Sequence, residues 1–332
     1  MTGAVFDRYR TSEEYEDHWL GGSSGMEFPD GKRFAFSILD DTDDSTLANV
    51  KPVYAALRDV GMRTTKTVWP MGCPEGSRLF FAGETLNDAA YLRFVHELAD
   101  QGFEIASHGA TMESSLRERT LRGLEFLKNE FGSYPRLFCN HGFNRDNLYW
   151  GHNRFQSALF RKIFSWTPGH RSIRYYGDDE NSPYFWGDIA HTHIQYIRNF
   201  TFRRLNMLEA NPDMPYRLRG TKYVNFWFST SDAPDVRAFN RLLTCERLDQ
   251  LERDGGACIV STHLGKGFAT NGKLDPDTER ILRYLSRKRG WFVPVSELLD
   301  YLRGKQGGGE LSDWTRLKLE WLFILDKLKI AS

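Results

Sequence analysis

From residue 34 onward, short β-rich runs alternate with amphipathic helical patterns along most of the chain. Strands are expected at 34–39, 63–69, 103–108, 134–142, 257–263 and 291–295, and helices at 47–61, 87–102, 114–132, 236–253 and 276–290. Alternation of this kind is typical of βα units, in which helices cover a sheet or barrel of parallel strands. The sequence therefore predicts the α/β class with a parallel sheet or barrel at its centre.

The segments outside this alternation set the expected domain boundaries. Residues 1–30 are expected as an N-terminal extension, and the α/β body is expected over 31–303. Residues from about 150 to 235 are rich in aromatic side chains without clear periodicity, so an insertion is expected there. The last segment, 304–332, begins as a glycine-rich linker and continues as a C-terminal amphipathic helix.

Composition excludes some classes of partner and favours one location. The 44 basic residues balance 44 acidic ones, so no nucleic-acid partner is expected. Four widely spaced cysteines indicate reduced thiols, and the N-terminus lacks the apolar core of a signal peptide. A cytoplasmic location is therefore expected. The final helix, with its lysine and tryptophan residues, suggests peripheral contact at the inner face of the membrane, or else packing against the barrel or a second subunit.

Polar, chemically capable residues follow several of the expected strands. They are Asp40, Asp41, His108, Asn140, His141 and His263. Each one alone has a structural explanation, such as a polar residue satisfied at a strand end. Because ligands and catalytic groups collect at the carboxyl ends of parallel strands, the whole set predicts one shared site.

The residue types at these strand ends favour a metal. Carboxylates crowded at one point repel each other and are best tolerated beside a cation. One carboxylate with imidazoles suits zinc, cobalt, iron, nickel or manganese, and a second carboxylate can act as a general base. This combination predicts metal-assisted hydrolysis. Two further aspartates, Asp43 and Asp44, are expected to cap the following helix or to lie behind the ligands.

The order and the sequences of these motifs resemble those of the polysaccharide deacetylases, also called the NodB-homology or carbohydrate esterase family 4 domain. ILDDT occupies the place of the family's Thr-Phe-Asp-Asp-Gly strand end, and QGFEIASH matches its second motif. IVSTHLG mirrors the final Leu-x-His strand end, and ILRYLSRKRGWFVPVSELL is similar to the family's ending. The resemblance spans residues 33–300 and implies a distorted (β/α) barrel of this type, here followed by a C-terminal helix.

The resemblance also implies roles for individual residues. Asp40 falls on the catalytic base and His263 on the general acid. Asp41 and His108 fall on two of the metal ligands. One divalent transition metal is implied as cofactor, with zinc expected first and cobalt, nickel, iron or manganese as alternatives.

Two departures from the family pattern affect this site. Met112 stands where the family has its second metal histidine, and Cys139 stands where it has the arginine that orients the catalytic aspartate. We infer His141, at the end of the neighbouring strand, as the third ligand. Asp43, Asp44 and Glu113 are the alternatives.

The expected function is metal-dependent removal of an N-acetyl or other acyl group from a sugar. The sugar would belong to a surface polysaccharide or to its cytoplasmic lipid- or nucleotide-linked precursor. Substrate contacts are expected from Asn140, Asn144, Trp150 and Trp227. The alternatives are a deformylase or other amide hydrolase on the same barrel, and a catalytically silent carbohydrate-binding or assembly protein. The oligomeric state stays open.

Overall fold

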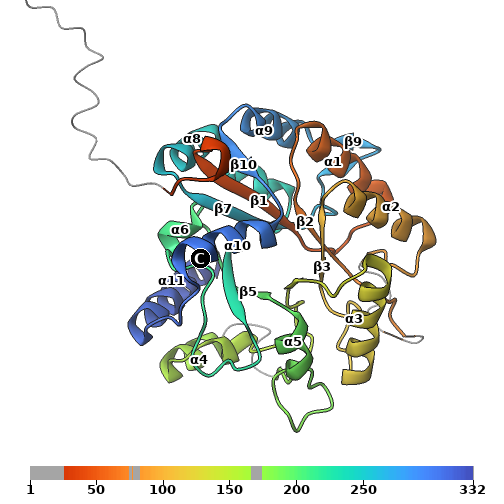
Figure 1. Cartoon of the computed structure of the whole chain (residues 1–332), viewed down its shortest axis with the longest axis vertical. Coiled ribbons are helices and arrows are strands. Elements are labelled where there is room, and N and C mark those ends of the chain that lie inside the picture. Colours follow the sequence, from red (N-terminus) through yellow and green to blue (C-terminus); the bar gives the residue numbers. More distant parts are fainter. Residues whose placement is uncertain (1–25, 75–76, 78–82, 166–173, 332) are drawn as a thin grey trace, which may run out of the picture.

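The computed structural model of the chain describes residues 26–74, 77, 83–165 and 174–331, and Figure 1 shows helices arranged around a central group of strands. Of the N-terminal extension expected at 1–30, residues 1–25 lie outside this described part.

Seven parallel strands form a closed barrel. In the order in which they pair, they are β1 (Phe34–Asp40), β2 (Thr65–Val68), β3 (Glu104–Ser107), β4 (Leu137–Phe138), β5 (Tyr196–Phe202), β6 (Phe226–Asp232) and β7 (Ala257–Thr262). Closure comes from β7, which pairs with β1 along six positions. The first half of β1 also pairs with β10 (Gly290–Phe292), and its second half pairs with β2. The predicted α/β barrel of parallel strands is confirmed.

Helices connect these strands and cover the outside of the barrel. They are α1 (Leu47–Asp59), α2 (Ala89–Asp100), α3 (Arg117–Phe131), α4 (Ala158–Ser165), α5 (Gly187–His193), α6 (Met207–Ala210), α7 (Val236–Leu242), α8 (Cys245–Asp254), α9 (Pro276–Ser286), α10 (Val295–Gln306) and α11 (Asp313–Ala331). Short 3-10 turns, η1 (Pro29–Gly31) and η2 (Gly151–Arg154), and a two-stranded sheet of β8 (Ala269–Thr270) and β9 (Lys273–Leu274) complete the described elements. The single helix expected at 236–253 is two helices, because Thr244 caps the start of α8.

Side chains of β1 alternate between two apolar clusters. Phe34, Phe36 and Ile38 belong to the cluster that includes residues of α1 and α2, so this face of the strand meets the helices. Ala35 and Leu39 belong to the other cluster. Since neighbouring residues of a strand point to opposite faces, Asp40 is directed toward the helices and Asp41 toward the inside of the barrel.

The aromatic segment expected as an insertion contributes two strands of the barrel. Both β5 and β6 lie entirely within 150–235. Their sequences, YIRNFTF and FWFSTSD, are buried along nearly their whole length. A strand covered on both faces does not alternate between apolar and polar residues, so periodicity did not reveal them.

The C-terminal helix α11 packs beside β5 and α4 (Figure 1). Leu319, Phe323 and Ile324 are buried in the core, while Trp314 and Trp321 are exposed. Across the described residues, every helix is too short or too polar to pass through a bilayer. Peripheral membrane contact through α11 stays a prediction.

Candidate metal centre

A cavity of about 520 Å³ lies at the carboxyl ends of the barrel strands. Its charged and imidazole side chains are Asp41, Asp43, His108, His141, Arg154, Arg198, Asp232, His263 and Lys327. The histidines predicted at three separate strand ends are therefore brought together by the closed barrel.

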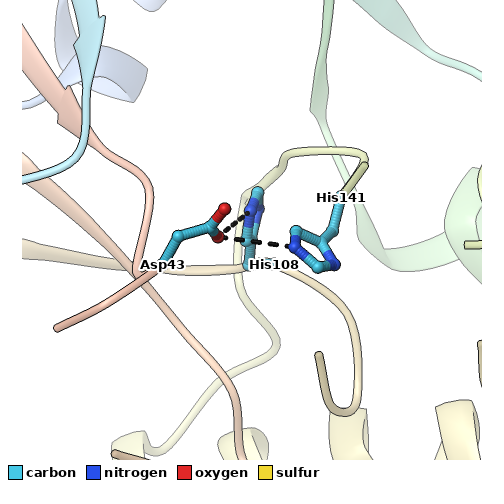
Figure 2. A group of neighbouring side chains, drawn as sticks. All are labelled: Asp43, His108 and His141. Atoms are coloured by element: carbon cyan, nitrogen blue, oxygen red, sulfur yellow. Dashed lines mark ion pairs between the residues drawn. The ribbon is translucent and has the colours of Figure 1, made fainter. Parts of the chain in front are cut away.

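Three side chains converge on one point of this cavity, as Figure 2 shows. Nε2 of His108 lies 3.3 Å from Oδ1 of Asp43, and Nε2 of His141 lies 3.5 Å from the same oxygen. The potential ligand atoms of the three residues all lie within 4.8 Å of one another. Two imidazoles and one carboxylate therefore share a volume the size of one metal ion.

The loops that carry the two histidines are held by backbone contacts. The amide of His108 donates to the carbonyl of Val68 at 3.2 Å, which continues the β2–β3 ladder past the end of β3. The His141 amide donates to Oδ1 of Asn147 at 3.1 Å, and the Asn147 amide group returns a bond to the His141 carbonyl at 3.0 Å. The backbone of both histidines is thus held by contacts within the chain.

The three residues fit a transition metal. Oδ1 of Asp43 and Nδ1 of both histidines are buried without a hydrogen-bond partner in the described part of the chain. Burial raises the pKa of Asp43, but the imidazoles of His108, His141 and His263 outweigh burial and hold the pKa far below its ordinary value. An ionised carboxylate beside two imidazoles is a ligand set for zinc and related metals.

Asp41 lies beside this cluster and is paired with an arginine. Its Oδ2 accepts from Nη1 of Arg198 at 2.6 Å, with both side chains buried. Its Oδ1 has no hydrogen-bond partner among the described residues and lies 4.0 Å from Nδ1 of His108. Burial raises the pKa of Asp41, but Arg198 and the neighbouring histidines lower it further, so the net pKa falls. An ionised carboxylate with one free oxygen therefore faces the centre.

Arg198 was not predicted from the sequence. In the β4–β5 ladder, Leu137 pairs with Tyr196 and Phe138 with Ile197, so Cys139 and Arg198 follow at equivalent positions. A guanidinium thus reaches Asp41 from the strand next to the one on which the family motif places it, across a small buried thiol at Cys139. The available signal was a charged residue inside the apolar run YIRNFTF, because an arginine is rarely buried without a specific partner.

His263 follows β7 and also lies beside the cluster. Its Nδ1 lies 2.7 Å from the Pro234 carbonyl, which can only accept, so Nδ1 donates. Nε2 is left to the cavity and lies 3.5 Å from Oδ2 of Asp43. Burial lowers the pKa of His263, but the carboxylates of Asp43 and Asp41 outweigh it and raise the pKa above its ordinary value.

Asp40, which the motif places as the base, lies outside the cavity. Its Oδ2 accepts from Nζ of Lys66 and from the Tyr54 hydroxyl, both at 2.8 Å, and its Oδ1 accepts from the Leu264 amide at 2.8 Å. Asp40 and Lys66 are fully buried. The physical reason is the strand alternation, which turns Asp40 toward α1. Asp40 therefore ties β1, β2, α1 and the His263 loop together.

The helix after β1 is capped by a different residue from those expected. Thr46 is the N-cap of α1, and Asn49 completes a capping box with it. Asp43 is thereby free of the capping role and enters the metal cluster, while Asp44 and Glu113 lie outside that cluster. Asp41, the aspartate that the motif places as a ligand, has Oδ2 bound by Arg198 and lies outside the same cluster.

Two of the four expected substrate contacts line the cavity. Asn140 does so, but its amide is engaged with the backbone of Leu148, donating at 3.1 Å and accepting at 2.9 Å. Trp150 also lines it, and its indole N–H donates to the Gly142 carbonyl at 2.8 Å. Of the two, Trp150 presents a ring that a ligand can contact.

The other two expected contacts lie elsewhere. Trp227 is 1% exposed and donates to the Thr221 hydroxyl at 3.0 Å, so it is part of the core. Asn144 is also buried and is not among the residues that line the cavity. Trp227 lies in β6, and its ring packs in the core, where a sugar cannot reach it.

Close packing of two loops fixes the position of Asp43. A Cβ added at Gly265 would lie 2.5 Å from the carbonyl carbon and oxygen of Asp44. The Asn49 side chain donates to the carbonyls of both residues, at 2.8 Å to Asp44 and 3.1 Å to Gly265. The loop after β7 therefore holds the loop after β1 in place only while residue 265 has no side chain.

We expect Gly265→Ala to weaken metal binding by about tenfold, because the Asp44 loop must move and takes Asp43 with it. Titration with zinc in the presence of a competing chelator measures the effect. Gly304→Ala is the matched control, since a Cβ there meets no atom within 4 Å. Equal zinc affinity in both variants would show that the loop contact does not position Asp43.

Comparisons with known proteins give the fold. No protein-family model matches the chain, and no curated protein matches it. A structure assigned as a polysaccharide deacetylase from Mycobacterium smegmatis has a TM-score of 0.51 at 14% identity, covering 85% of this chain and 94% of that one. A corresponding assignment from Pseudomonas aeruginosa PAO1 has a TM-score of 0.50 at 12% identity, covering 85% and 94%.

A third solved structure, Puue allantoinase, has a TM-score of 0.51 at 11% identity and covers 84% of this chain and 93% of that one. All three similarities extend over the barrel. Their sequence identities are too low to indicate a shared function. The similarities agree with the architecture built above and with the motifs in the sequence. The chain thus has the fold of the NodB-type polysaccharide deacetylases, a closed barrel of seven parallel strands surrounded by helices.

Proposed function

We propose that the protein is a metal-dependent hydrolase that removes an acyl group, in the first place N-acetyl, from an amino sugar. The sugar would belong to a polysaccharide or to its lipid- or nucleotide-linked precursor. One observation carries the proposal: a ligand set for a metal, a carboxylate held by an arginine, and a histidine whose Nε2 faces the cavity all line the same cavity. The assignment of two proteins with this fold as polysaccharide deacetylases supports the substrate class.

Asp43, His108 and His141 would hold the metal. A divalent transition metal, when bound, lowers the pKa of water and polarises an acyl carbonyl. Zinc is the first expectation, and cobalt, nickel, iron and manganese suit the same donors.

Asp41 would act as the general base in place of Asp40. Its Oδ1 is unpaired and adjoins the centre, so it can accept a proton from the attacking water. Arg198 keeps Oδ2 occupied, which fixes the carboxylate and keeps it ionised before the reaction. A base of this kind needs both an open oxygen and a fixed orientation, and Asp41 has both.

His263 would act as the general acid. The Pro234 carbonyl fixes the ring through Nδ1, so a proton on Nε2 points into the cavity. Without a bound metal, burial lowers the pKa of His263, but the carboxylates of Asp43 and Asp41 outweigh burial and raise it. Nε2 can therefore protonate the leaving amine when the amide bond breaks.

A second candidate is hydrolysis of an amide outside the sugars. The fold similarity to an allantoinase, whose name gives allantoin as its substrate, is as high as that to the first deacetylase. The proposed roles of Asp41, His263 and the metal ligands would be the same. The products separate the candidates: acetate supports the deacetylase, formate or ammonia supports a deformylase or another amide hydrolase, and opening of a cyclic amide such as allantoin without release of a small molecule supports an allantoinase-like reaction.

Metal content tests the proposed centre directly. We expect about one transition metal per chain in the purified protein by elemental mass spectrometry, and loss of this metal in Asp43→Ala, His108→Ala and His141→Ala, because three protein ligands are the minimum for a catalytic zinc site. His191→Ala, an exposed histidine on α5, should keep the metal.

Acetate release from N-acetylated amino sugars is the matching activity measurement. It should disappear on chelation and return when zinc is added. Full metal content in the three variants, or undiminished hydrolysis after chelation, would contradict the proposal.

A further inference from the structure

The cavity extends beyond the metal centre to a region formed by η2, α4 and α11. Its lining includes Trp150, Arg154, Phe164, Phe323 and Lys327. This region adjoins the residues that carry the proposed chemistry, so a substrate whose acyl group reached the centre would place other parts of itself here. Its charges therefore bear on what that substrate is.

Most charged groups of the cavity are paired within the chain. Arg198 pairs with Asp41 at 2.6 Å, and Lys327 pairs with Asp232 at 2.8 Å. Asp43 adjoins the imidazoles of the metal cluster. Among the described residues that line the cavity, the remaining charge is Arg154.

Arg154 has no anionic partner in the part of the chain that the structure describes. Only 6% of the residue is exposed, its Nε is buried without a hydrogen bond, and its side chain makes no ion pair. The guanidinium stacks on the Trp150 ring at 3.8 Å and lies 5.0 Å from the centroid of Phe323. These aromatic rings hold the group in place and leave its hydrogen-bond donors unused.

Burial lowers the pKa of Arg154 to about 9, and the nearby charge of Arg198 contributes. The group is still a cation at neutral pH. A buried cation without a counter-ion costs several kcal/mol as an order of magnitude, so the fold alone gives no reason to keep it. An anion supplied from outside the chain would offset that cost.

A second unsatisfied donor lies nearby. The Tyr175 hydroxyl is buried without a partner among the described residues, and the positive charge of Arg154 acts on it electrostatically. The ring of Tyr175 packs against Gly151, where an added Cβ would come within 2.3 Å of its Cε2. The glycine thus lets Tyr175 approach η2, the turn that carries Arg154.

We propose that Arg154 binds a carboxylate or phosphate group of the substrate, while Tyr175, which is not among the residues that line the cavity, packs against the turn that carries Arg154. This rests on the proposed function and narrows it: the substrate is an N-acylated amino sugar that carries an anionic group. A guanidinium suits both anions, since its planar array of donors matches their oxygens. The stacked Trp150 ring would keep that array directed at the anion.

Binding of three probes to the zinc-loaded protein tests the proposal by isothermal titration calorimetry. The probes are N-acetylglucosamine, N-acetylglucosamine 1-phosphate and N-acetylglucosaminuronic acid. At least one anionic probe should bind about tenfold or more tightly than the neutral sugar, since a buried charged hydrogen-bonded pair is worth at least that much. Preference for the phosphate or for the uronic acid identifies the source of the anion.

Variants of Arg154 distinguish anion binding by this side chain from attraction of the anion to zinc. Arg154→Gln should remove the preference for the anionic probe, whereas Arg154→Lys should keep part of it. Arg154→Lys also serves as the test if Arg154→Gln does not fold, because it keeps the charge but not the planar array of donors. Arg122→Gln, at an exposed arginine on α3, is the matched control and should leave all affinities unchanged.

Equal binding of the neutral and anionic probes by the wild type would overturn the subsite. So would an unchanged preference in folded Arg154→Gln. The readout is independent of hydrolysis: a lost preference in the variant with no acetate release in any condition would support the subsite while the deacetylase proposal fails. Acetate release at equal rates from neutral and anionic sugars would support the deacetylase and reject the subsite.

Discussion

Replacing Asp40 with asparagine is expected to lower the free energy of unfolding by about 3–5 kcal/mol, because the change leaves a fully buried lysine without its counter-ion. Nζ of Lys66 lies 2.8 Å from Oδ2 of Asp40, and both side chains have zero exposure. The same carboxylate accepts from the hydroxyl of Tyr54 and the amide of Leu264. Urea denaturation of wild type and variant measures the loss.

The double variant Asp40→Asn, Lys66→Met is the control for this result. Removing both charges leaves no unpaired ion, so it should recover most of the stability that the single variant loses. Folded Asp40→Asn should also retain its metal, since Asp40 lies outside the cavity. A single variant as stable as wild type, but without hydrolytic activity, would return the role of base to Asp40.

The sequence contained the information that separates the two aspartates. In FAFSILDD, the large residues Phe34, Phe36 and Ile38 occur at every second position, and Asp40 continues that series. The series faces the helices. The family motif identifies the base and the metal ligand from the Asp-Asp dipeptide alone. In the folded chain, the face of the strand decides which of the two aspartates is directed toward the cavity. In this chain the pair that reaches the centre is Asp41 and Asp43, which is one residue later than the motif's base and two residues later than its ligand.

How much could be predicted depended on what covers each strand. The βα units in the first and last parts of the barrel sequence were recognisable because amphipathic helices follow their strands, as α2 follows β2. His108, His141 and His263 could be expected at one site because parallel strands end at one edge. By contrast, β5 is covered on both faces and carries Arg198 among aromatic residues, so neither the strand nor its functional residue stood out.

Asp43 was difficult for another reason. It lies in a loop after β1, where strand alternation no longer applies, and Asp44 beside it has a positive φ of 59°. A cluster of aspartates before a helix is also a common capping pattern. The direction of this loop depends on contacts with distant segments, such as the one with Gly265, which joins segments more than 200 residues apart.

The assignment of Asp41 as base predicts the largest effect on activity. Asp41→Asn should lower kcat for acetate release by about a thousandfold, within the range for a general base, while metal content stays at the wild-type level. The asparagine has the same shape but cannot take the proton from water. Steady-state kinetics together with elemental analysis of the same preparation gives both quantities.

Two further variants, Asp43→Asn and Arg198→Met, distinguish a general-base role of Asp41 from a metal-ligand role. Asp43→Asn should lose the metal and the activity together, because an amide oxygen is a poor ligand for zinc. Arg198→Met should keep the metal but lose activity, since Oδ2 of Asp41 is no longer held, and Arg198→Lys should recover part of it. If Asp41→Asn instead lost its metal while Asp43→Asn kept it, Asp41 would be the ligand that the motif indicates. Arg198 would then hold a metal ligand, not a base.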